Sequence, residues 1–323
     1  MKFLCVTGYG ATGQTALLDL IREFKNYNIP PNFEFRLIKD PHGIIDLENF
    51  LVNDWDILRS DYAIKDFLEL CNVINRKDLK LFQIGYDYQR DVSKSFILDA
   101  HTYINKISTI TYLGKSRIYD FKLSKYDFFK KKLLNKLFGL NKSSVMFLSQ
   151  PNKEQFIIET RKFIEQIFKN FSGTADTIVV DNAIPTSNIT KALNYFNSIK
   201  LIIVDRDPRD TYVDLRRKNL LIGAELIASD DVYKYIKWFK TIRHKTNIDN
   251  KNIIKIKFED LILDYDNTLK EIKQFLGDDI EHIDKFKFLD PQKSRKNIGI
   301  WKDYPNQEVM TRIANELPEY CYN

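Results

Sequence analysis

Glycines and hydroxyl side chains form a short cluster near the start of the chain, Gly8-Tyr-Gly-Ala-Thr-Gly-Gln-Thr15. Glycines let the backbone turn tightly enough to direct several N–H groups toward one point. The apolar or small residues 3–7 predict a buried strand before the cluster, and residues 16–21 predict a helix with one apolar face after it. Because a helix N-terminus carries a partial positive charge, this order of elements predicts a site for an anion, most often a phosphate.

Three phosphate-binding motifs nearly fit this loop. The spacing Gly-x-Gly-x-x-Gly over 8–13, followed about 20 positions later by Glu34, matches the dinucleotide-binding fingerprint. The spacing Gly-x-x-x-x-Gly-Gln-Thr over 8–15 matches a phosphate loop in which glutamine replaces the lysine. Residues 9–15, Tyr-Gly-Ala-Thr-Gly-Gln-Thr, are also similar to a donor loop that runs aromatic, x, Lys or Arg, Ser, Gly, Thr or Ser, Thr. The loop alone therefore does not identify its ligand.

The bulk composition is that of a globular protein with a sizeable core. The 323 residues are 44% hydrophobic and 29% charged, with a net charge of +6. No stretch approaches the roughly 18 apolar residues of a membrane span, and the start of the chain does not read as a signal sequence. Cys5, Cys71 and Cys321 are scattered, without metal-ligand spacing, and fit a reducing compartment. We expect a cytoplasmic protein with no metal and no nucleic-acid partner.

Basic residues are concentrated between 115 and 142, where nine lysines and arginines stand against two aspartates. Within this segment, Phe128-Phe-Lys-Lys-Lys-Leu-Leu-Asn-Lys-Leu-Phe138 has apolar and basic residues at helical spacing. The pattern suits a helix on a membrane surface, a site for an anionic glycan, or the solvated face of a lid. The surrounding region, 78–150, is expected to be a helical insertion or lid.

The remaining chain alternates strand and helix patterns. Strands are expected at 33–38, 177–181, 200–205 and 252–257, and helices at 46–52, 61–73, 152–171, 186–196, 226–245, 263–276 and 306–316. Short apolar strands interleaved with helices predict an α/β fold, a parallel sheet with helices on both faces. We expect one domain over 1–323.

A charged cluster, Asp205-Arg-Asp-Pro-Arg-Asp210, follows the expected strand 200–205 and precedes a helix beginning near Pro208. Open parallel sheets bind ligands at the carboxyl ends of their strands, so Arg206 is expected in the same crevice as the glycine loop. A guanidinium there can hold a second phosphate through two N–H groups. The alternatives are a surface cluster of salt bridges and the metal-binding Asp-x-Asp of a glycosyltransferase at 205–207.

Four segments together resemble the sulfotransferase family, in the order in which that family has them. They are residues 9–15, Val204-Asp-Arg-Asp-Pro-Arg-Asp-Thr-Tyr-Val213, Lys257-Phe-Glu-Asp-Leu261 and Arg295-Lys-Asn-Ile-Gly-Ile-Trp-Lys302. The resemblance implies a parallel sheet of the P-loop NTPase-like sulfotransferase type. It also implies a donor, 3′-phosphoadenosine 5′-phosphosulfate (PAPS), which becomes adenosine 3′,5′-bisphosphate (PAP). Region 78–150 is not covered.

The same resemblance implies the donor-binding residues. They are Gly10, Ala11, Thr12, Gly13, Gln14 and Thr15 at the 5′-phosphosulfate, Arg206 at the 3′-phosphate, Phe258 at the adenine, and Arg295, Lys296 and Asn297 closing over the 3′-phosphate. Two positions depart from the family. Its loop lysine or arginine aligns with Ala11, which leaves open the cation that stabilises the leaving group. Its serine in the 3′-phosphate segment aligns with Asp214, where we do not expect a direct phosphate contact.

Glu34 is the expected general base, because relatives that use a glutamate have it near the start of the strand after the loop's helix. The alternative places Glu34 on a solvated face, and His42 and His101 are further candidates. Tyr233-x-x-x-Lys237 matches the catalytic pair of short-chain dehydrogenases, but core packing explains these residues better.

The resemblance implies sulfonate transfer from PAPS to a hydroxyl of a saccharide or glycan. The basic segment 115–142 suggests an acceptor that is anionic or lipid-linked, with peripheral membrane contact as a further hypothesis. The alternatives are an NAD(P)-dependent reductase of the Rossmann type and a nucleotide-binding relative without catalysis. The sequence does not indicate the oligomeric state.

Overall fold

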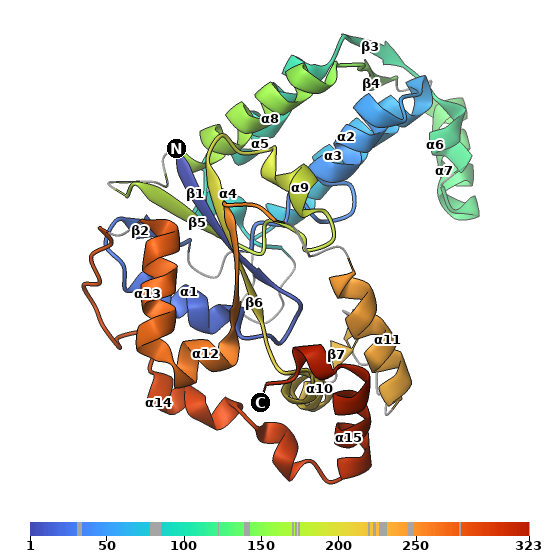
Figure 1. Ribbon diagram of the computed structural model, residues 1–323. Coiled ribbons are helices and arrows are strands. Elements are labelled where there is room, and N and C mark those ends of the chain that lie inside the picture. The colour runs from blue at the N-terminus through green and yellow to red at the C-terminus, as the bar shows by residue number, and fades with distance from the viewer. Residues whose placement is uncertain are drawn as a thin grey trace.

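The computed structural model describes residues 1–30, 34–77, 85–121, 123–138, 143–169, 171, 173, 175–218, 220–221, 224–225, 231–244, 249–277 and 279–322. A five-stranded parallel sheet in the order β2-β5-β1-β6-β9 forms its centre (Figure 1). The strands are β1 (Lys2–Gly8), β2 (Tyr27–Asn28), β5 (Thr177–Asp181), β6 (Ile199–Asp205) and β9 (Ile253–Lys257). Helices cover both faces, so the predicted α/β fold is confirmed.

Alternate residues of the central strand β1 face two separate cores, as expected for a strand buried on both sides. Phe3 and Cys5 belong to one core with α3 (Ile57–Ile74), α5 (Phe96–Ile107) and α8 (Lys153–Phe168). Leu4 and Val6 belong to the other, with α1 (Gln14–Arg22), α12 (Phe258–Leu263) and α13 (Tyr265–Leu276). A third cluster joins α10 (Pro208–Arg217), α11 (Val232–Arg243) and α15 (Gln307–Glu316). The two sides of the sheet therefore place α1 and α3 in different layers.

Shorter elements complete the described chain. They are α2 (Ile44–Glu48), the π-helix η1 (Asn49–Asn53), α4 (Tyr88–Asp91), β3 (Ile110–Gly114), α6 (Arg117–Phe121), α7 (Lys125–Phe138), β4 (Ser144–Leu148), α9 (Ile189–Leu193), β7 (Leu220–Leu221), β8 (Ala224–Glu225), α14 (Pro291–Ser294), and the 3₁₀ helices η2 (Arg295–Asn297), η3 (Ile300–Asp303) and η4 (Pro318–Tyr320). In the region 78–150 an antiparallel β3–β4 pair accompanies the helices, and α6 and α7 project from the rest of the molecule (Figure 1). Within the described ranges no helix has the length and apolarity needed to cross a membrane.

The strand predicted at 33–38 is wrong in its described part. Glu34 makes a single parallel bridge with Asp181, after which the chain leaves the sheet. The N–H of Arg36 donates to the hydroxyl of Tyr88 at 2.8 Å, so this donor is satisfied without a neighbouring strand. The outer neighbour of β5 in the sheet is instead the two-residue β2.

Helix boundaries also differ from the predictions. The helix expected at 186–196 is only the five residues of α9, and a short helix, α12, follows directly after the expected strand 252–257. Of the helix expected at 226–245, residues 226–230 and 245 lie outside the described part. The helices expected at 152–171 and 306–316 are present as α8 and α15.

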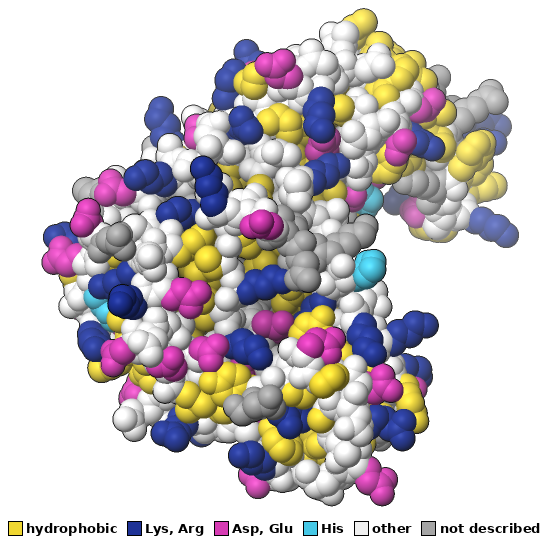
Figure 2. Space-filling model, in the orientation of Figure 1, with side chains coloured by type: hydrophobic (Ala, Val, Ile, Leu, Met, Phe, Trp, Pro, Cys, Tyr) yellow, Lys and Arg dark blue, Asp and Glu magenta, His cyan; other side chains and the backbone are white. Residues whose placement is uncertain are grey.

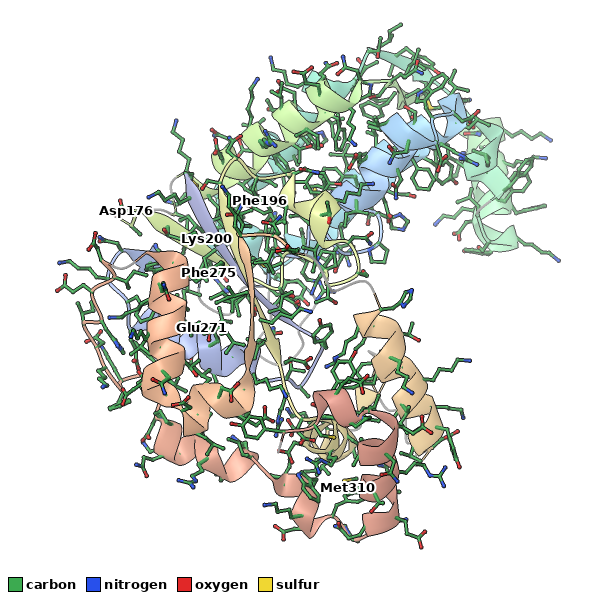
Figure 3. All side chains as sticks on the ribbon, viewed as in Figure 1. Asp176, Phe196, Lys200, Glu271, Phe275 and Met310 are labelled. Carbon is green, nitrogen blue, oxygen red and sulfur yellow. The ribbon has the colours of Figure 1, made fainter. Side chains whose placement is uncertain are left out.

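Lys200 of β6 fastens α13 to the sheet (Figure 3). Its Nζ donates to the carbonyl oxygens of Phe275 at 2.6 Å and Leu276 at 2.9 Å, at the C-terminal end of the helix. Burial lowers the pKa of Lys200. An ammonium group is nevertheless favourable there, because the last carbonyls of a helix carry partial negative charge.

Candidate functional site

The glycine loop between β1 and α1 takes up backbone conformations that side chains disfavour. Gly10, Ala11 and Gly13 have φ angles of 87°, 55° and 89°. Gly13 is the N-cap residue of α1 and makes no side-chain cap hydrogen bond. Thr12 is only 1% exposed, and its Oγ1 accepts from the N–H of Tyr9 at 3.2 Å, so this hydroxyl stabilises the turn. The first turn of α1 can thus present its N–H groups to an anion.

Gly13 is required for a second reason, the close approach of Phe258. A Cβ atom at position 13 would lie 2.4 Å from Cδ2 of that ring, whereas a Cβ at Gly10 would meet nothing within 4 Å. Phe258 is buried, at 4% exposure, and lies at the first position of α12. The loop and the aromatic ring therefore form one wall.

A cavity of about 660 Å³ lies against this wall. It brings the whole predicted loop, residues 10–15, together with Arg206, Phe258 and Asn297. These segments are far apart in the sequence and meet because β1 and β6 are neighbours in the sheet. Arg295 and Lys296 are exposed on η2 and are not among the lining residues, so their predicted closure over a phosphate stays a prediction.

Arg206 is a buried cation on the cavity wall, at 4% exposure. Its Nη1 donates to the carbonyl oxygen of Ala11 at 3.0 Å, and its Nη2 donates to the carbonyl oxygen of Asn297 at 2.5 Å. Its guanidinium also lies over the ring of Phe258, with Cζ 5.3 Å from the centroid. Its Nε has no hydrogen-bond partner among the described residues, and such a buried donor costs about 1–3 kcal/mol. The guanidinium as a whole lines the cavity, where its positive charge favours an anion.

Asp214, in α10, is the residue that aligns with the serine of the 3′-phosphate segment. Its Oδ2 pairs with Nη1 of Arg206 at 3.1 Å and accepts from Nζ of Lys218 at 3.2 Å. The carboxylate thus offsets part of the positive charge of two cations that line the same cavity. It holds Arg206 in place, which is a role that its sequence position did not predict.

Asp210 connects the segment 295–302 to the start of α10 through two hydrogen bonds. Its Oδ2 accepts from the N–H of Gly299 at 2.7 Å, and its Oδ1 accepts from the N–H of Trp301 at 3.0 Å. Burial raises the pKa of Asp210. Together with the Arg206 contact to Asn297, these bonds place the loop that ends in Trp301 beside the cavity.

Glu34 is held by several donors at the carboxyl end of β5. Nη1 of Arg36 lies 2.9 Å from its Oε2, and Nζ of Lys39 lies 2.5 Å from its Oε1. Nδ2 of Asn182, a residue that lines the cavity, also donates to Oε1 at 2.5 Å. Burial opposes ionisation of Glu34, but Lys39 and Arg36 outweigh it and lower its pKa. Glu34 is not a lining residue itself and is linked to the cavity through Asn182.

Asp181 is the neighbouring carboxylate and shows the opposite behaviour. Burial and the negative charge of Glu34 raise its pKa to about 7. Nε2 of Gln14, from the glycine loop, donates to its Oδ1 at 3.0 Å. Two adjacent carboxylates with pKa values pushed apart are an arrangement suited to acid–base chemistry. Sequence reasoning missed Asp181, whose only signal was its place at the end of an expected strand.

Lys39 and Lys218 are candidates for the cation that the loop lacks at Ala11. Lys218 lines the cavity but is 53% exposed at its side chain. Lys39 is 19% exposed and acts on Asp181 as well as on Glu34, but it is not among the residues that line the cavity. The ammonium of Lys39 is therefore the better shielded of the two from water.

The other predicted residues lie elsewhere. His101 is exposed on α5, and His42 lines a second cavity described below. Tyr233 is 62% exposed, so core packing does not explain it, although Tyr235 beside it is fully buried. Its predicted partner Lys237 is exposed on the same helix.

The Asp-x-Asp pair at 205–207 takes part in structural interactions. Asp205 forms an ion pair with Arg243 at 2.6 Å, and Asp207 caps α10 by accepting from the N–H of Arg209 at 2.7 Å. Arg243 also stacks on Tyr9, with Cζ 3.9 Å from the ring centroid. Sequence reasoning missed Arg243, because no motif surrounds it.

No family model matches the chain, and no curated protein matches it. Solved structures with a similar arrangement include the sulfotransferase domain of the olefin synthase of Synechococcus PCC 7002, at 14% identity, 100% coverage of this chain, 94% of that chain and a TM-score of 0.44. They also include the sulfotransferase domain from the curacin biosynthetic pathway, at 14% identity, 98% and 97% coverage and a TM-score of 0.41. Retinol dehydratase in complex with androsterone and the inactive cofactor PAP matches at 13% identity, 99% and 81% coverage and a TM-score of 0.38.

Proposed function

We propose that this protein transfers a sulfonate group from PAPS to an acceptor hydroxyl. The observation that carries the proposal is Arg206, a buried guanidinium whose Nε has no partner among the described residues, on the same cavity as the N-terminus of α1. These are two separate anion-binding features, and PAPS has two separate anionic groups. Phe258 adds an aromatic surface for the adenine between them.

The reaction needs positioning, charge stabilisation and one proton acceptor. A new bond forms between the acceptor oxygen and sulfur while the bond between sulfur and the bridging phosphate oxygen breaks, which leaves PAP. The hydroxyl proton passes to Glu34, with Asp181 as the neighbouring carboxylate. The N–H groups at 13–15 and the ammonium of Lys39 would stabilise the charge that develops on the leaving phosphate.

The acceptor we propose is a hydroxyl of a lipid-linked saccharide or glycan. The described part of segment 115–142 supports this through α7, whose Tyr126, Phe129, Leu133 and Leu137 are 74%, 72%, 50% and 64% exposed. Lysines lie between these side chains, and Figure 2 shows both kinds together where α6 and α7 project. Such a surface fits an anionic membrane, with apolar side chains in the interface and ammonium groups at the head groups.

A Rossmann-type reductase is the main alternative, since the loop spacing is compatible with it. In that reading Glu34 would bind a ribose through a free carboxylate. The observed ion pairs of Glu34 with Arg36 and Lys39 argue against such a role. A nucleotide-binding relative without catalysis, suggested by Ala11, is separated by measuring turnover.

Thermal shift with two nucleotides tests the donor assignment. PAP at a hundred times its Kd should stabilise the fold by about 2.7 kcal/mol, and NADPH should give no shift. Arg206→Ala should lose the PAP response, and Arg206→Lys should retain part of it because a charge remains without the planar fork. Arg209→Ala is the control, since Arg209 pairs with Asp207 but does not line the cavity. Stabilisation by NADPH, or an unchanged PAP response in Arg206→Ala, would refute the proposal.

A further inference from the structure

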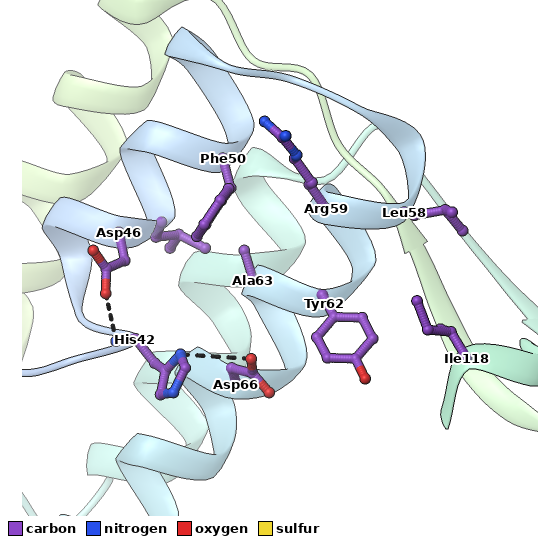
Figure 4. Close-up of a pocket in the computed structure, with 10 residues that line it drawn as sticks. His42, Asp46, Phe50, Leu58, Arg59, Tyr62, Ala63, Asp66 and Ile118 are labelled. Atoms are coloured by element: carbon purple, nitrogen blue, oxygen red, sulfur yellow. Dashed lines mark hydrogen bonds and ion pairs between the residues drawn. The ribbon is translucent and has the colours of Figure 1, made fainter. Parts of the chain in front are cut away.

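A second cavity, of about 370 Å³, lies between α2, α3 and α6 (Figure 4). Its walls are largely apolar and include Leu47, Phe50, Leu58, Ala63 and Ile118. The sulfonate-transfer chemistry described above uses none of these side chains. A concave, mainly apolar space of this size is typical of a site for a small molecule or for one end of a larger one.

His42, Asp46 and Asp66 are gathered at one edge of this cavity, and Arg59 lies on another side of it (Figure 4). Nδ1 of His42 lies 3.5 Å from Oδ2 of Asp66, and the backbone N–H of His42 donates to Oδ2 of Asp46 at 2.7 Å (Figure 4). His42 is half exposed, at 56% of its side chain. The cavity thus has an apolar interior and a polar, accessible rim, which matches a ligand with an apolar body and a polar end.

A tight loop connects this rim to Glu34. The N–H of Ile44 donates to the carbonyl oxygen of Leu37 at 2.8 Å, which closes the loop that carries both Lys39 and His42. A Cβ at Gly43 would lie 2.4 Å from the carbonyl oxygen of Leu37, so the closure depends on glycine. Three residues span at most about 10 Å, so His42 lies within that distance of Lys39 along the chain. Lys39 in turn binds Glu34, at 2.5 Å.

From this arrangement we infer that the second cavity holds the apolar group of the acceptor, and that the acceptor is an amphiphile whose hydroxyl extends past His42 toward Lys39 and Glu34. The inference rests on the proposed function and narrows its acceptor class. A polyanionic chain would have to place its charges against leucine, phenylalanine and isoleucine and beside the carboxylates Asp46 and Asp66, with Arg59 as its one arginine partner among the lining residues, which is unfavourable. An alkyl or polyprenyl group gains from the same contact.

Alkyl β-glucosides of increasing chain length, used below their micelle concentrations, test this subsite. Methyl, butyl, hexyl and octyl glucoside share one head group, so differences in affinity report the chain alone. In the presence of PAP, calorimetry should show affinity rising by about fourfold for each added methylene until the cavity is full. The same series offered as acceptors with PAPS should show KM falling with chain length.

Leu58→Asp and Ile57→Asp form a matched pair of variants. Both residues begin α3 and are about half exposed, at 52% and 49%, so both variants should fold. Only Leu58 lines the cavity. Leu58→Asp should abolish the dependence on chain length, and Ile57→Asp should preserve it. Ala63→Phe, which fills the cavity from α3, should also abolish the dependence while leaving the thermal response to PAP unchanged.

Equal affinities for methyl and octyl glucoside, or equal behaviour of the two aspartate variants, would overturn the subsite. The outcome is separable from that of the proposed function. A protein that fails to respond to PAP refutes the donor assignment, whereas a normal PAP response with a flat glucoside series refutes only the apolar subsite.

Discussion

The two cavities differ in what forms their walls. The larger one, at the carboxyl end of the parallel sheet, is lined by the glycine loop 10–15, by charged side chains that include the buried Arg206, and by aromatic residues such as Phe258. The smaller one lies between helices and is formed by side chains such as Phe50 and Leu58. Backbone and a buried guanidinium fix a ligand by geometry and charge, whereas apolar side chains fix it by volume. The donor side should therefore tolerate little change, and the acceptor side should accommodate related ligands.

The largest effect is expected at Glu34, which is linked to the larger cavity through Asn182 and to the loop that carries His42 through Lys39. Glu34→Gln should lower turnover by about 10²–10⁴-fold because the proton acceptor is lost. Affinities for PAP and octyl glucoside should change little, since Glu34 lines neither cavity. Single-turnover kinetics would measure the chemical step, and separate calorimetry with PAP and octyl glucoside would show whether the two binding affinities are unchanged.

The pH profile identifies which carboxylate acts. Because neighbouring cations lower the pKa of Glu34, a Glu34 base is already ionised and turnover should be constant between pH 6 and 8. Asp181, with a pKa of about 7, must lose its proton to act as a base, so its activity would rise through that pH. An inflection of the pH–rate profile near pH 7 that disappears in Asp181→Asn would show that Asp181, and not Glu34, is the general base.

The next effect concerns the acceptor side. Alanine at Lys130, Lys131 and Lys132 should weaken binding to vesicles of phosphatidylcholine and phosphatidylserine by about 100-fold, since each lysine near an anionic surface contributes about 1 kcal/mol. PAP affinity should not change. The matched control is the alanine triple at Lys285, Lys287 and Lys293, which are exposed outside α7. Sedimentation of vesicles gives the affinities, and equal binding by both triples would exclude α7 as the contact.

The smallest effect compares two glycines of one loop. Gly10→Ala introduces only an unfavourable φ, about 1–2 kcal/mol, whereas Gly13→Ala also drives a Cβ into Phe258. Gly13→Ala should therefore bind PAP about tenfold more weakly than Gly10→Ala, with the glucoside series intact in both. Calorimetry and urea denaturation would measure the two changes. Equal PAP affinities would mean that Phe258 does not shape the donor cavity.

Features encoded by short segments could be predicted from the sequence. The strand, glycine loop and helix of 2–22 were recognised because their pattern is local, and β6 with Arg206 followed from an apolar strand ending in charge. Their meeting in one cavity followed from a general property of parallel sheets. Phe258 joined them only through the family resemblance.

Features that depend on side chains from distant segments could not be predicted. The alternating pattern at 33–38 suggested a strand, but the hydroxyl of Tyr88 takes a backbone N–H that a strand would have paired. The pKa of Asp181 depends on Glu34, and the wall of the smaller cavity needs Ile118 beside Phe50. These residues form no recognisable pattern in the sequence, because only tertiary packing brings them together.

The position of β1 in the sheet has a consequence for synthesis of the chain. Both of its neighbours are late: it pairs with β5 at 177–181 and β6 at 199–205. At about 5–20 residues per second, the ribosome needs roughly 10–40 s to make the residues in between. During that time an apolar strand stands without its partners, and the loop that follows it has no Arg206 to bind. The nascent chain therefore exposes its central strand until β5 and β6 have been made, and residues 2–8 are a segment that a chaperone could cover during that time.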